Sequence, residues 1–258
     1  MTMAEKKIPR EGTKAYEAYI LREEKKKQAR IEEQKRMYAL FEMERTYRKE
    51  GYRLICGVDE AGRGPLAGPV VAGAVIFPED CDILYINDSK KLSKKKREEL
   101  YQTIREKALY CNVGLATVEE IDEVNVLEAD YLAMQRAIAG LGVEPDLLLN
   151  DAVTIPEEDM KQISIIKGDA KSASIGAASI LAKVTRDHIM ESYDRLVPEY
   201  GFAKHAGYGT KAHYEAIETY GILSLHRRTF LQKRIDEGRL QVKYNDLCLP
   251  RAEELLDW

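Results

Sequence analysis

The strongest constraint on the fold is a glycine-rich, acidic turn that joins two apolar runs. Residues 52–58 form a short apolar run, and residues 70–77 form a longer one rich in β-branched side chains. Runs of this kind favour buried strands. Residues 57–69, which lead from one run to the other, read GVDEAGRGPLAGP. We therefore predict two neighbouring strands joined by a bent, polar connection.

Two adjacent carboxylates, Asp59 and Glu60, end the first of these strands. Neighbouring side chains of a strand point to opposite faces, so both acids can serve one site only where the backbone bends. Gly62 and Gly64 supply that bend and let a large ligand approach the backbone closely. An ordinary polar turn explains the glycines. It does not explain an acid pair beside Arg63, a cation flanked by glycine on both sides.

A dinucleotide-binding loop is a second interpretation of the same turn. Residues 62–67 match the pattern G-x-G-x-x-A. Such a loop must open a helix whose N-terminus binds a pyrophosphate, whereas residues 70–77 favour a strand. The two carboxylates would also repel a pyrophosphate. We therefore reject nucleotide binding at this turn.

The composition limits the class of protein. The chain has 258 residues, of which 45% are hydrophobic and 33% charged, which suits one or two globular domains. Its net charge of −4 means that nucleic-acid binding needs a local basic patch. No apolar run approaches the ~20 residues of a membrane span, and the N-terminus lacks a signal-peptide core. We expect a soluble, cytoplasmic protein.

The cysteines are widely spaced and include no C-x-x-C pair, which argues against a zinc site or a disulfide framework. They are Cys56, Cys81, Cys111 and Cys248. Reduced thiols are therefore expected.

Residues 1–50 differ in composition from the rest of the chain. They hold 14 Lys and Arg, 10 Glu and no Asp, a local charge of +4 that leaves −8 for residues 51–258. We predict a charged helical N-terminal extension, with one long helix over residues 13–48 that is broken at most once. A body over residues 51–231 and a tail over residues 232–258 follow. The extension is either a solvated, loosely packed helix or a basic arm that touches nucleic acid or a partner.

The rest of the chain predicts an α/β fold with a mixed central sheet flanked by helices. Further strands are expected at residues 110–117, 146–151 and 163–167, helices at residues 93–107, 126–140, 174–197 and 211–220, and a polar connection at residues 118–125. A helix between two strands indicates a right-handed crossover and parallel pairing.

Four carboxylates stand at or just after predicted strand ends: Asp59, Glu60, Asp151 and Asp169. An all-oxygen cluster suits Mg²⁺ or Mn²⁺ rather than zinc. Two such ions about 3.5–4 Å apart can clamp the attacking and leaving oxygens of a phosphodiester. The sequence therefore predicts a two-ion site. Asp187 is interpreted as an ion-pair partner, because it lies on a predicted helix beside Arg186.

Two further groups are candidates for contacts with a substrate. Lys90 and Lys91 lie in the loop before a predicted helix, and contact of one of them with a phosphate stays open. Tyr208 lies in a loop between Gly207 and Gly209.

The histidines are weaker candidates. His188 and His213 fall within predicted helices and are expected at the surface, whereas a substrate role is open for His205 and His226. Because no histidine is paired with a plausible Ser or Cys nucleophile, triad chemistry is not supported.

In combination these motifs resemble the bacterial ribonuclease HII family, the type 2 ribonucleases H. The resemblance runs from about residue 52 to residue 230 and rests on the segments at residues 57–69, 88–93, 167–169, 177–187, 207–210 and 226–228. It implies a ribonuclease H-like fold. It also implies an endonuclease that cuts the RNA strand of RNA–DNA hybrids, and that cuts 5′ of single ribonucleotides embedded in duplex DNA.

The resemblance also implies roles for individual residues. Asp59, Glu60 and Asp151 match the metal-binding acids of the family, and Asp169 matches its fourth active-site acid. Residues 62–64 match the motif that senses the ribose 2′-hydroxyl.

Tyr208 matches the tyrosine that acts with this motif. Asn150 departs from the family pattern, because an amide precedes the third acid; we expect Asp151 to face the metal and Asn150 the opposite side. The expected cofactors are two Mg²⁺ or Mn²⁺ ions. From the clustered acids and the absence of a suitable histidine pair we expect hydrolysis by water, with products that carry 3′-hydroxyl and 5′-phosphate ends. The protein is expected to be a monomer without a membrane partner.

Two alternatives remain beside this interpretation. Ribonuclease HIII carries Lys in place of the arginine of Gly-Arg-Gly and an N-terminal domain that contains strands, so Arg63 and the helical N-terminus argue against it. A non-catalytic hybrid-binding protein of the same fold is the other alternative. A pure binder of phosphates has no use for four clustered negative charges.

Overall fold

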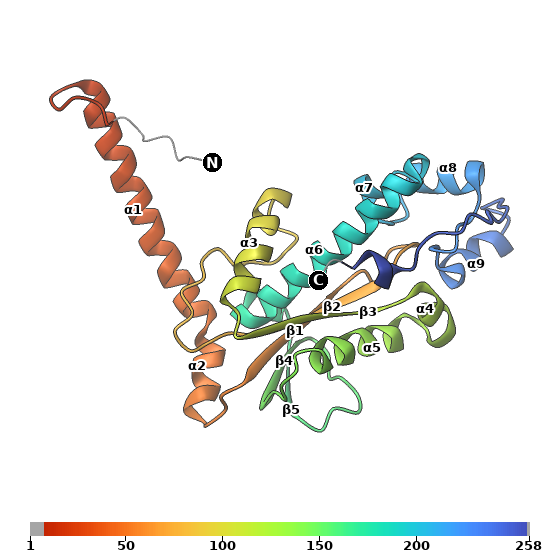
Figure 1. The fold of residues 1–258 in the computed structure, drawn as a ribbon, viewed down its shortest axis with the longest axis horizontal. Coiled ribbons are helices and arrows are strands. Elements are labelled where there is room, and N and C mark those ends of the chain that lie inside the picture. The colour runs from red at the N-terminus through yellow and green to blue at the C-terminus, as the bar shows by residue number, and fades with distance from the viewer. Residues whose placement is uncertain (1–7, 257–258) are drawn as a thin grey trace.

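The computed structural model describes residues 8–256, so residues 1–7 of the predicted extension and residues 257–258 of the predicted tail lie outside the described range. Figure 1 shows a twisted sheet with helices on both faces and one long N-terminal helix that extends away from this body. Within residues 8–256, no helix combines the length and apolar character that crossing a membrane requires.

The sheet has five strands in the order β3-β2-β1-β4-β5. They are β1 (Ile55–Ala61), β2 (Val70–Ile76), β3 (Tyr110–Ala116), β4 (Leu147–Asp151) and β5 (Lys161–Ile165). β1 pairs antiparallel with β2 and parallel with β4, so the sheet is mixed. The predicted α/β fold with a mixed central sheet is therefore confirmed.

One helix packs on each face of the sheet (Figure 1). α6 (Ala173–Leu196) lies on β1 and β2, and α5 (Val126–Ala139) lies on β2 and β3 from the other side. The approach of α6 is very close: a Cβ on Gly73 would lie 2.4 Å from the Ala178 carbonyl oxygen, and one on Gly57 would lie 2.2 Å from the Ser174 carbonyl carbon. Only glycine fits at these two strand positions.

The remaining helices surround this core. They are α3 (Lys94–Lys107), α4 (Val118–Val124), α7 (Phe202–His205), α8 (Lys211–Tyr220) and α9 (Arg228–Asp236), with short 3₁₀ turns at Gly168–Ala170, Pro198–Tyr200 and Ala252–Leu255. Ser93 caps α3 as its sequence position suggests, by accepting a hydrogen bond from Lys96 N.

Two expectations about local structure were wrong. Residues 118–125 are not a plain connection: α4 forms there because Thr117 and Glu120 make a capping box and Ile121 is buried. The last strand lies two residues earlier than predicted. It ends at Ile165 because Lys167 adopts a left-handed conformation with φ 58°, which turns the backbone out of the extended path of a strand.

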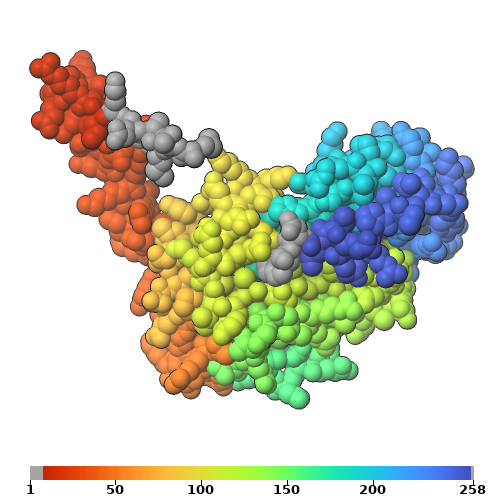
Figure 2. Space-filling model, viewed as in Figure 1, coloured from red at the N-terminus to blue at the C-terminus, as the bar shows by residue number. Residues whose placement is uncertain are grey.

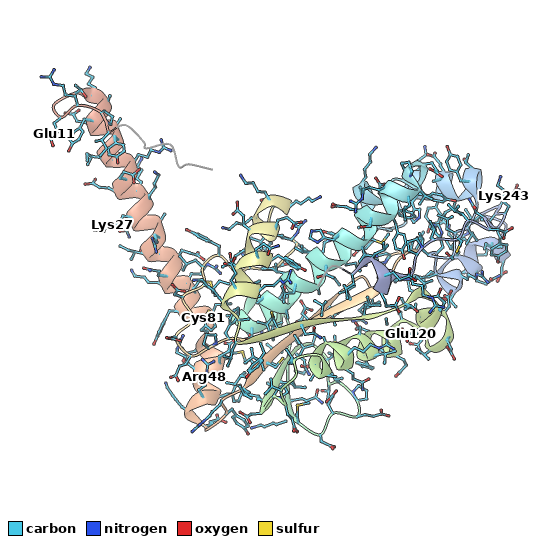
Figure 3. The ribbon with its side chains drawn as sticks, in the orientation of Figure 1. Glu11, Lys27, Arg48, Cys81, Glu120 and Lys243 are labelled. Carbon is cyan, nitrogen blue, oxygen red and sulfur yellow. The ribbon has the colours of Figure 1, made fainter. Side chains whose placement is uncertain are left out.

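The N-terminal region forms two helices, α1 (Lys14–Leu40) and α2 (Glu42–Lys49), with a single break at Phe41. Figure 2 shows α1 as an arm that stands clear of the body. In Figure 3, Lys27 lies along this arm and Glu11 lies in the turn before it, far from the body, while Arg48 lies at the body.

The base of the arm is part of the body. Met37, Leu40 and Phe41 are buried in the same apolar cluster as the residues between α6 and the sheet. Arg36 donates to the Ile86 carbonyl at 2.7 Å, and Arg48 donates to the Phe77 carbonyl at 2.7 Å. A truncation that spares the body therefore has to end before Arg36.

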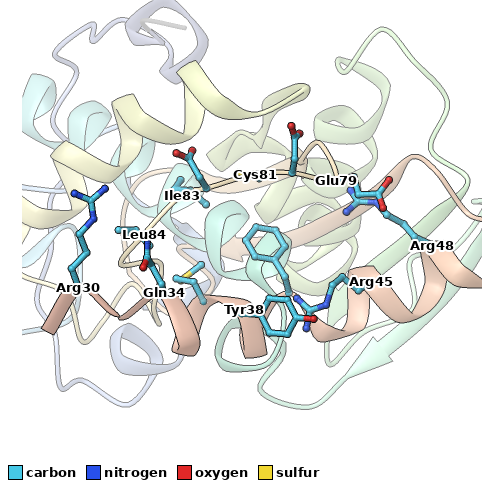
Figure 4. Close-up of a pocket in the computed structure, with 13 residues that line it drawn as sticks. Arg30, Gln34, Tyr38, Arg45, Arg48, Glu79, Cys81, Ile83 and Leu84 are labelled. Atoms are coloured by element: carbon cyan, nitrogen blue, oxygen red, sulfur yellow. The ribbon is translucent and has the colours of Figure 1, made fainter. Parts of the chain in front are cut away.

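A pocket of about 310 Å³ lies where α1 and α2 meet the loop of residues 79–84 (Figure 4). Tyr38 and Arg45 stack on its α1–α2 side, with the guanidinium carbon 3.6 Å from the ring centroid. Its other walls carry both acidic and basic side chains. None of its lining residues belongs to the predicted site.

Candidate active site

The pairing of β1 with β4 brings the predicted carboxylates together. The two strands are parallel, and Val58 is paired with Asn150, so Asp59 and Asp151, which follow these residues, lie at the same end of the sheet. A pocket of about 540 Å³ opens there. All nine residues predicted for the site line it: Asp59, Glu60, Gly62, Arg63, Gly64, Lys90, Asp151, Asp169 and Tyr208.

Asp59 is the most buried of the four acids, with 5% of its surface exposed. Its Oδ1 accepts a hydrogen bond from Glu60 N at 2.8 Å. Burial raises the pKa of Asp59 well above its ordinary value, and the charges of Glu60 and Asp151 raise it further, while a hydrogen bond from Ser179 acts in the opposite direction. The ionised form of this carboxyl therefore needs a nearby cation.

Asp151 and Asn150 serve opposite sides of β4, as expected. Asp151 faces the pocket, and its Oδ1 accepts from Gly168 N at 2.7 Å. Asn150 is fully buried and donates to Gln162 Oε1 at 2.8 Å. The amide before the third acid therefore belongs to the packing between β4 and β5, outside the pocket.

Asp169 lies on the 3₁₀ turn Gly168–Ala170, which follows the left-handed Lys167. Partial burial and the charges of Asp88 and Asp151 raise the pKa of its carboxyl. The charge of Asp151 thus raises the pKa of Asp169 as it raises the pKa of Asp59.

The donors of this cluster fit Mg²⁺ or Mn²⁺. All are carboxylate oxygens, and Glu60 Oε2 is buried without a hydrogen-bond partner among residues 8–256. A divalent cation would offset the repulsion that raises the pKa values of Asp59 and Asp169. Over the described range, however, no three His, Cys, Asp or Glu side chains already stand in a metal-holding arrangement. Ligation therefore requires these side chains to close in on the ion.

Two buried arginines fix the turn that carries Gly62, Arg63 and Gly64. Arg227 donates to the carbonyls of Gly62 at 2.6 Å, Arg63 at 2.9 Å and Gly68 at 2.8 Å. Arg186 donates to Pro69, Ala67 and Ala206, each at 2.9 Å. Gly62 has φ 103°, and a Cβ there would lie 2.2 Å from Arg186 Nε. The turn is thus shaped around these guanidinium groups and admits only glycine at this position.

Arg186 also ties the turn to the Tyr208 loop. Arg186 bonds both Ala67 and Ala206, and Leu66 N donates to the Gly207 carbonyl at 2.8 Å. A Cβ on Gly64 would lie 3.6 Å from Tyr208 Cε1. The exposed Tyr208 ring therefore stands directly over the end of the Gly-Arg-Gly turn.

Sequence and structure comparisons identify the relatives of this chain. The sequence model of the family described as Ribonuclease HII matches residues 56–233. A Ribonuclease HII from Clostridioides difficile (strain 630) is 61% identical over 183 residues, which make up 71% of this chain and 72% of that protein. The Ribonuclease HII of Bacillus subtilis (strain 168) is 54% identical over 206 residues, 80% of each chain. The chain belongs to the ribonuclease HII family.

The fold agrees with this assignment. The crystal structure of the ribonuclease H2 from Pyrococcus horikoshii OT3 matches with a TM-score of 0.60 and 31% sequence identity, over 72% of this chain and 97% of that one. The resemblance to ribonuclease HII and the predicted ribonuclease H-like fold are thereby confirmed, and the chain is a type 2 ribonuclease H.

Sequence reasoning missed one buried carboxylate beside this ribonuclease HII site. Asp130 on α5 is completely buried, and its Oδ2 lies 3.5 Å from Arg63 Nε. Glu60 Oε1 lies 3.5 Å from Arg63 Nη1, so the guanidinium stands between two acids. Burial and the Glu60 charge raise the pKa of Asp130 to about 8, against the opposing effect of Arg63. The available signal was an acid in register with Ala133 and Met134 on the apolar face of α5.

A group of cations in the lining of the pocket was also missed. Arg97 and Lys183 line the pocket with Lys90. Asp187 holds this pair: its Oδ1 lies 2.5 Å from Lys183 Nζ, and its Oδ2 lies 3.8 Å from Arg97 Nη2. Asp187 is therefore an ion-pair partner, as predicted. Lys183 was identifiable from its spacing of four residues after Ser179, which places both on one face of α6.

Two buried histidines, His213 and His226, pack behind the Tyr208 loop. His213 was expected at the surface, but it is fully buried, because its Nδ1 hydrogen-bonds the Tyr208 carbonyl at 3.0 Å and its Nε2 lies 3.1 Å from His226 Nε2. Burial lowers the pKa of His213 to about 4 and that of His226 to about 3, so both rings are neutral near pH 7. His188 remains partly exposed beside Glu98, as expected.

The arginine framework yields a first prediction. Arg227→Lys replaces a planar fork with a point charge that cannot reach three carbonyls at once. Each buried carbonyl left without a donor costs about 1–3 kcal/mol. We expect the free energy of unfolding, measured by urea denaturation, to fall by that amount or more. Arg228→Lys, at the exposed neighbouring position, should change it by no more than about 0.5 kcal/mol. Equal stability of the two variants would contradict this role of Arg227.

Proposed function

We propose that this protein is a metal-dependent endonuclease for ribonucleotides in duplexes with DNA. It cuts the RNA strand of RNA–DNA hybrids and cuts on the 5′ side of single ribonucleotides embedded in duplex DNA. The observation that carries the proposal is one pocket, in a ribonuclease HII chain, that is lined by Asp59, Glu60, Asp151 and Asp169 and also by cationic and aromatic groups suited to nucleic acid. We further propose that the protein acts as a monomer.

The acids hold the ions in this proposal. Two bound Mg²⁺ or Mn²⁺ ions supply stabilisation of the attacking and leaving oxygens of a phosphodiester. Asp59 and Asp151, which come from adjacent strands, would hold these ions together with Glu60 and Asp169. Phosphate charge is balanced by Arg97 and Lys183 on α3 and α6, and by Lys90 in the loop before α3.

Hydrolysis by water explains the expected products. Water attacks phosphorus and the 3′ oxygen leaves, which gives 3′-hydroxyl and 5′-phosphate ends. Attack by the ribose 2′-hydroxyl instead needs a proton-transfer pair beside the sugar. Among the described residues that line the pocket there is no histidine, and His213 and His226 are buried behind the Tyr208 loop. The pocket therefore favours water as the nucleophile.

The turn of residues 62–64 recognises the ribose in this proposal. A 2′-hydroxyl both donates and accepts hydrogen bonds, and backbone groups at Gly62 and Gly64 can approach it without a Cβ in the way. Arg63 is 43% exposed and can reach the adjacent phosphate. Tyr208 lies over Gly64 with 47% of its surface exposed, so its ring is free to pack on the neighbouring deoxyribose.

A test of the ion site uses isosteric amides. Asp59→Asn and Asp151→Asn keep the shape of each side chain and remove its charge, so kcat on a labelled RNA–DNA hybrid should fall by orders of magnitude. The folded structure and binding of the hybrid should persist. Asp236→Asn, on the exposed face of α9, is the control and should cleave like the wild type. Unchanged turnover in Asp151→Asn would contradict the proposed ion site, and a wild type that binds but never cuts would indicate a non-catalytic binder.

A test of ribonucleotide recognition uses Tyr208. Tyr208→Ala should lower kcat/KM for a duplex with one ribonucleotide far more than for a continuous hybrid, because a continuous hybrid offers many alternative contacts. Tyr208→Phe should be intermediate, since it keeps the ring and loses the hydroxyl. Tyr220→Ala, a comparably exposed tyrosine outside the pocket, should alter neither value. If Tyr208→Ala lowers both values by the same factor, Tyr208 does not recognise the junction.

A further inference from the structure

A buried glutamate of the N-terminal helices reaches the helix behind the acid cluster. Glu44 lies on α2 and is 1% exposed. Its Oε1 accepts hydrogen bonds from Ser172 Oγ at 2.7 Å and from Ser174 N at 2.9 Å. Ser172 is itself the N-cap of α6 and accepts from Ile175 N at 3.2 Å. Glu44 and Ser172 thus cap α6 jointly, and the carboxylate is further stabilised by the positive end of the helix dipole.

From Ser172 the contacts continue to two of the acids. Ser172 N donates to the Gly168 carbonyl at 2.9 Å, which closes the turn that carries Asp169. Gly168 N donates to Asp151 Oδ1 at 2.7 Å. The turn of residues 168–172 is therefore fixed at one end by Asp151 and at the other by Glu44.

Packing alone does not call for a charge at Glu44. A buried carboxylate is costly unless hydrogen bonds compensate for lost hydration. Two donors meet its Oε1, but its Oε2 is buried with no hydrogen-bond partner among the described residues. An apolar side chain would fill the same space at lower cost, so the hydrogen bonds to Ser172 and Ser174 are the specific feature of this position.

We propose that Glu44 is a positioning residue, which sets the spacing of Asp151 and Asp169 for divalent cations through Ser172 and Gly168. The inference rests on the proposed function of the acid cluster. It gives the N-terminal helices a part in the active site, although α2 lies outside residues 56–233, the range matched by the family. Outer partners of metal ligands are known to change metal affinity by about 10–100-fold when they are removed.

The experiment measures Mn²⁺ binding to the full chain by calorimetry, without nucleic acid. Glu44→Ala should weaken binding by about 10-fold or more. The Mn²⁺ affinity of Glu44→Gln should stay within about 3-fold of the wild-type value, because the amide oxygen can still accept hydrogen bonds from Ser172 and Ser174. Glu42→Ala removes the same side chain type from an exposed position of α2 and should bind like the wild type.

The same variants are then assayed for cleavage over a range of Mn²⁺ concentrations. Glu44→Ala should need proportionally more Mn²⁺ for half-maximal rate and approach wild-type kcat at saturation. Wild-type Mn²⁺ affinity in folded Glu44→Ala, or an equal loss in Glu42→Ala, overturns the inference.

If Glu44→Ala does not fold, Ser172→Ala decides. It removes the hydroxyl through which Ser172 donates to Glu44, while the backbone bonds from Ser174 to Glu44 and from Ser172 to Gly168 can remain. Weakened Mn²⁺ binding in Ser172→Ala supports the inference, and unchanged binding overturns it. A wild type that binds no Mn²⁺ contradicts the proposed function itself, which separates the two failures.

Discussion

The parallel pairing of β1 with β4 is the constraint on which the site depends. It places Asp59 and Asp151 on neighbouring strands at one end of the sheet, where each raises the electrostatic cost of the other. Packing has to hold such a cluster together, because its own charges push it apart. The packing comes from α6, which meets β1 and β2 at backbone distance through Gly57 and Gly73. The acid cluster thus depends on the close contact between α6 and the sheet.

The loops on the substrate-facing side of the pocket are held by two buried arginines. Arg186 and Arg227 are buried and donate only to backbone carbonyls of the loops around Gly62 and Ala206. Five-donor guanidinium groups are suited to this, since each can satisfy several carbonyls of an irregular loop at once. The loops themselves have little regular structure, so their shape is set by these two side chains. Arg63 is left exposed to meet a ligand, between Glu60 and Asp130.

Local sequence patterns were enough to predict the sheet, the main helices and the acid cluster. Asp59 and Asp151 follow apolar β-rich runs, and strand ends of this kind meet at one sheet edge whatever the detailed packing. Features that depend on contacts between distant segments were not predictable. Arg227 reaches Gly62 across 165 positions of sequence, and no local pattern around residue 227 indicates that contact.

Asp130 and His213 show the same limit. Each lies on a helix whose face toward the body could be guessed only roughly. Asp130 meets Arg63 from the distant turn of residues 62–64, and His213 meets Tyr208 and His226 on either side of it in the chain. Glu44 is a further case, because its helix reads as a solvated, charged segment until Ser172 is placed beside it.

The most direct test of the account follows the chemistry at one ribonucleotide. A duplex of DNA with a single embedded ribonucleotide, labelled at its 5′ end, is incubated with the protein in Mg²⁺ or in EDTA. We expect one cut on the 5′ side of the ribonucleotide in Mg²⁺, a labelled fragment with a 3′-hydroxyl that a polymerase can extend, and no cut in EDTA. A 2′,3′-cyclic phosphate end, or equal cleavage in EDTA, would contradict it.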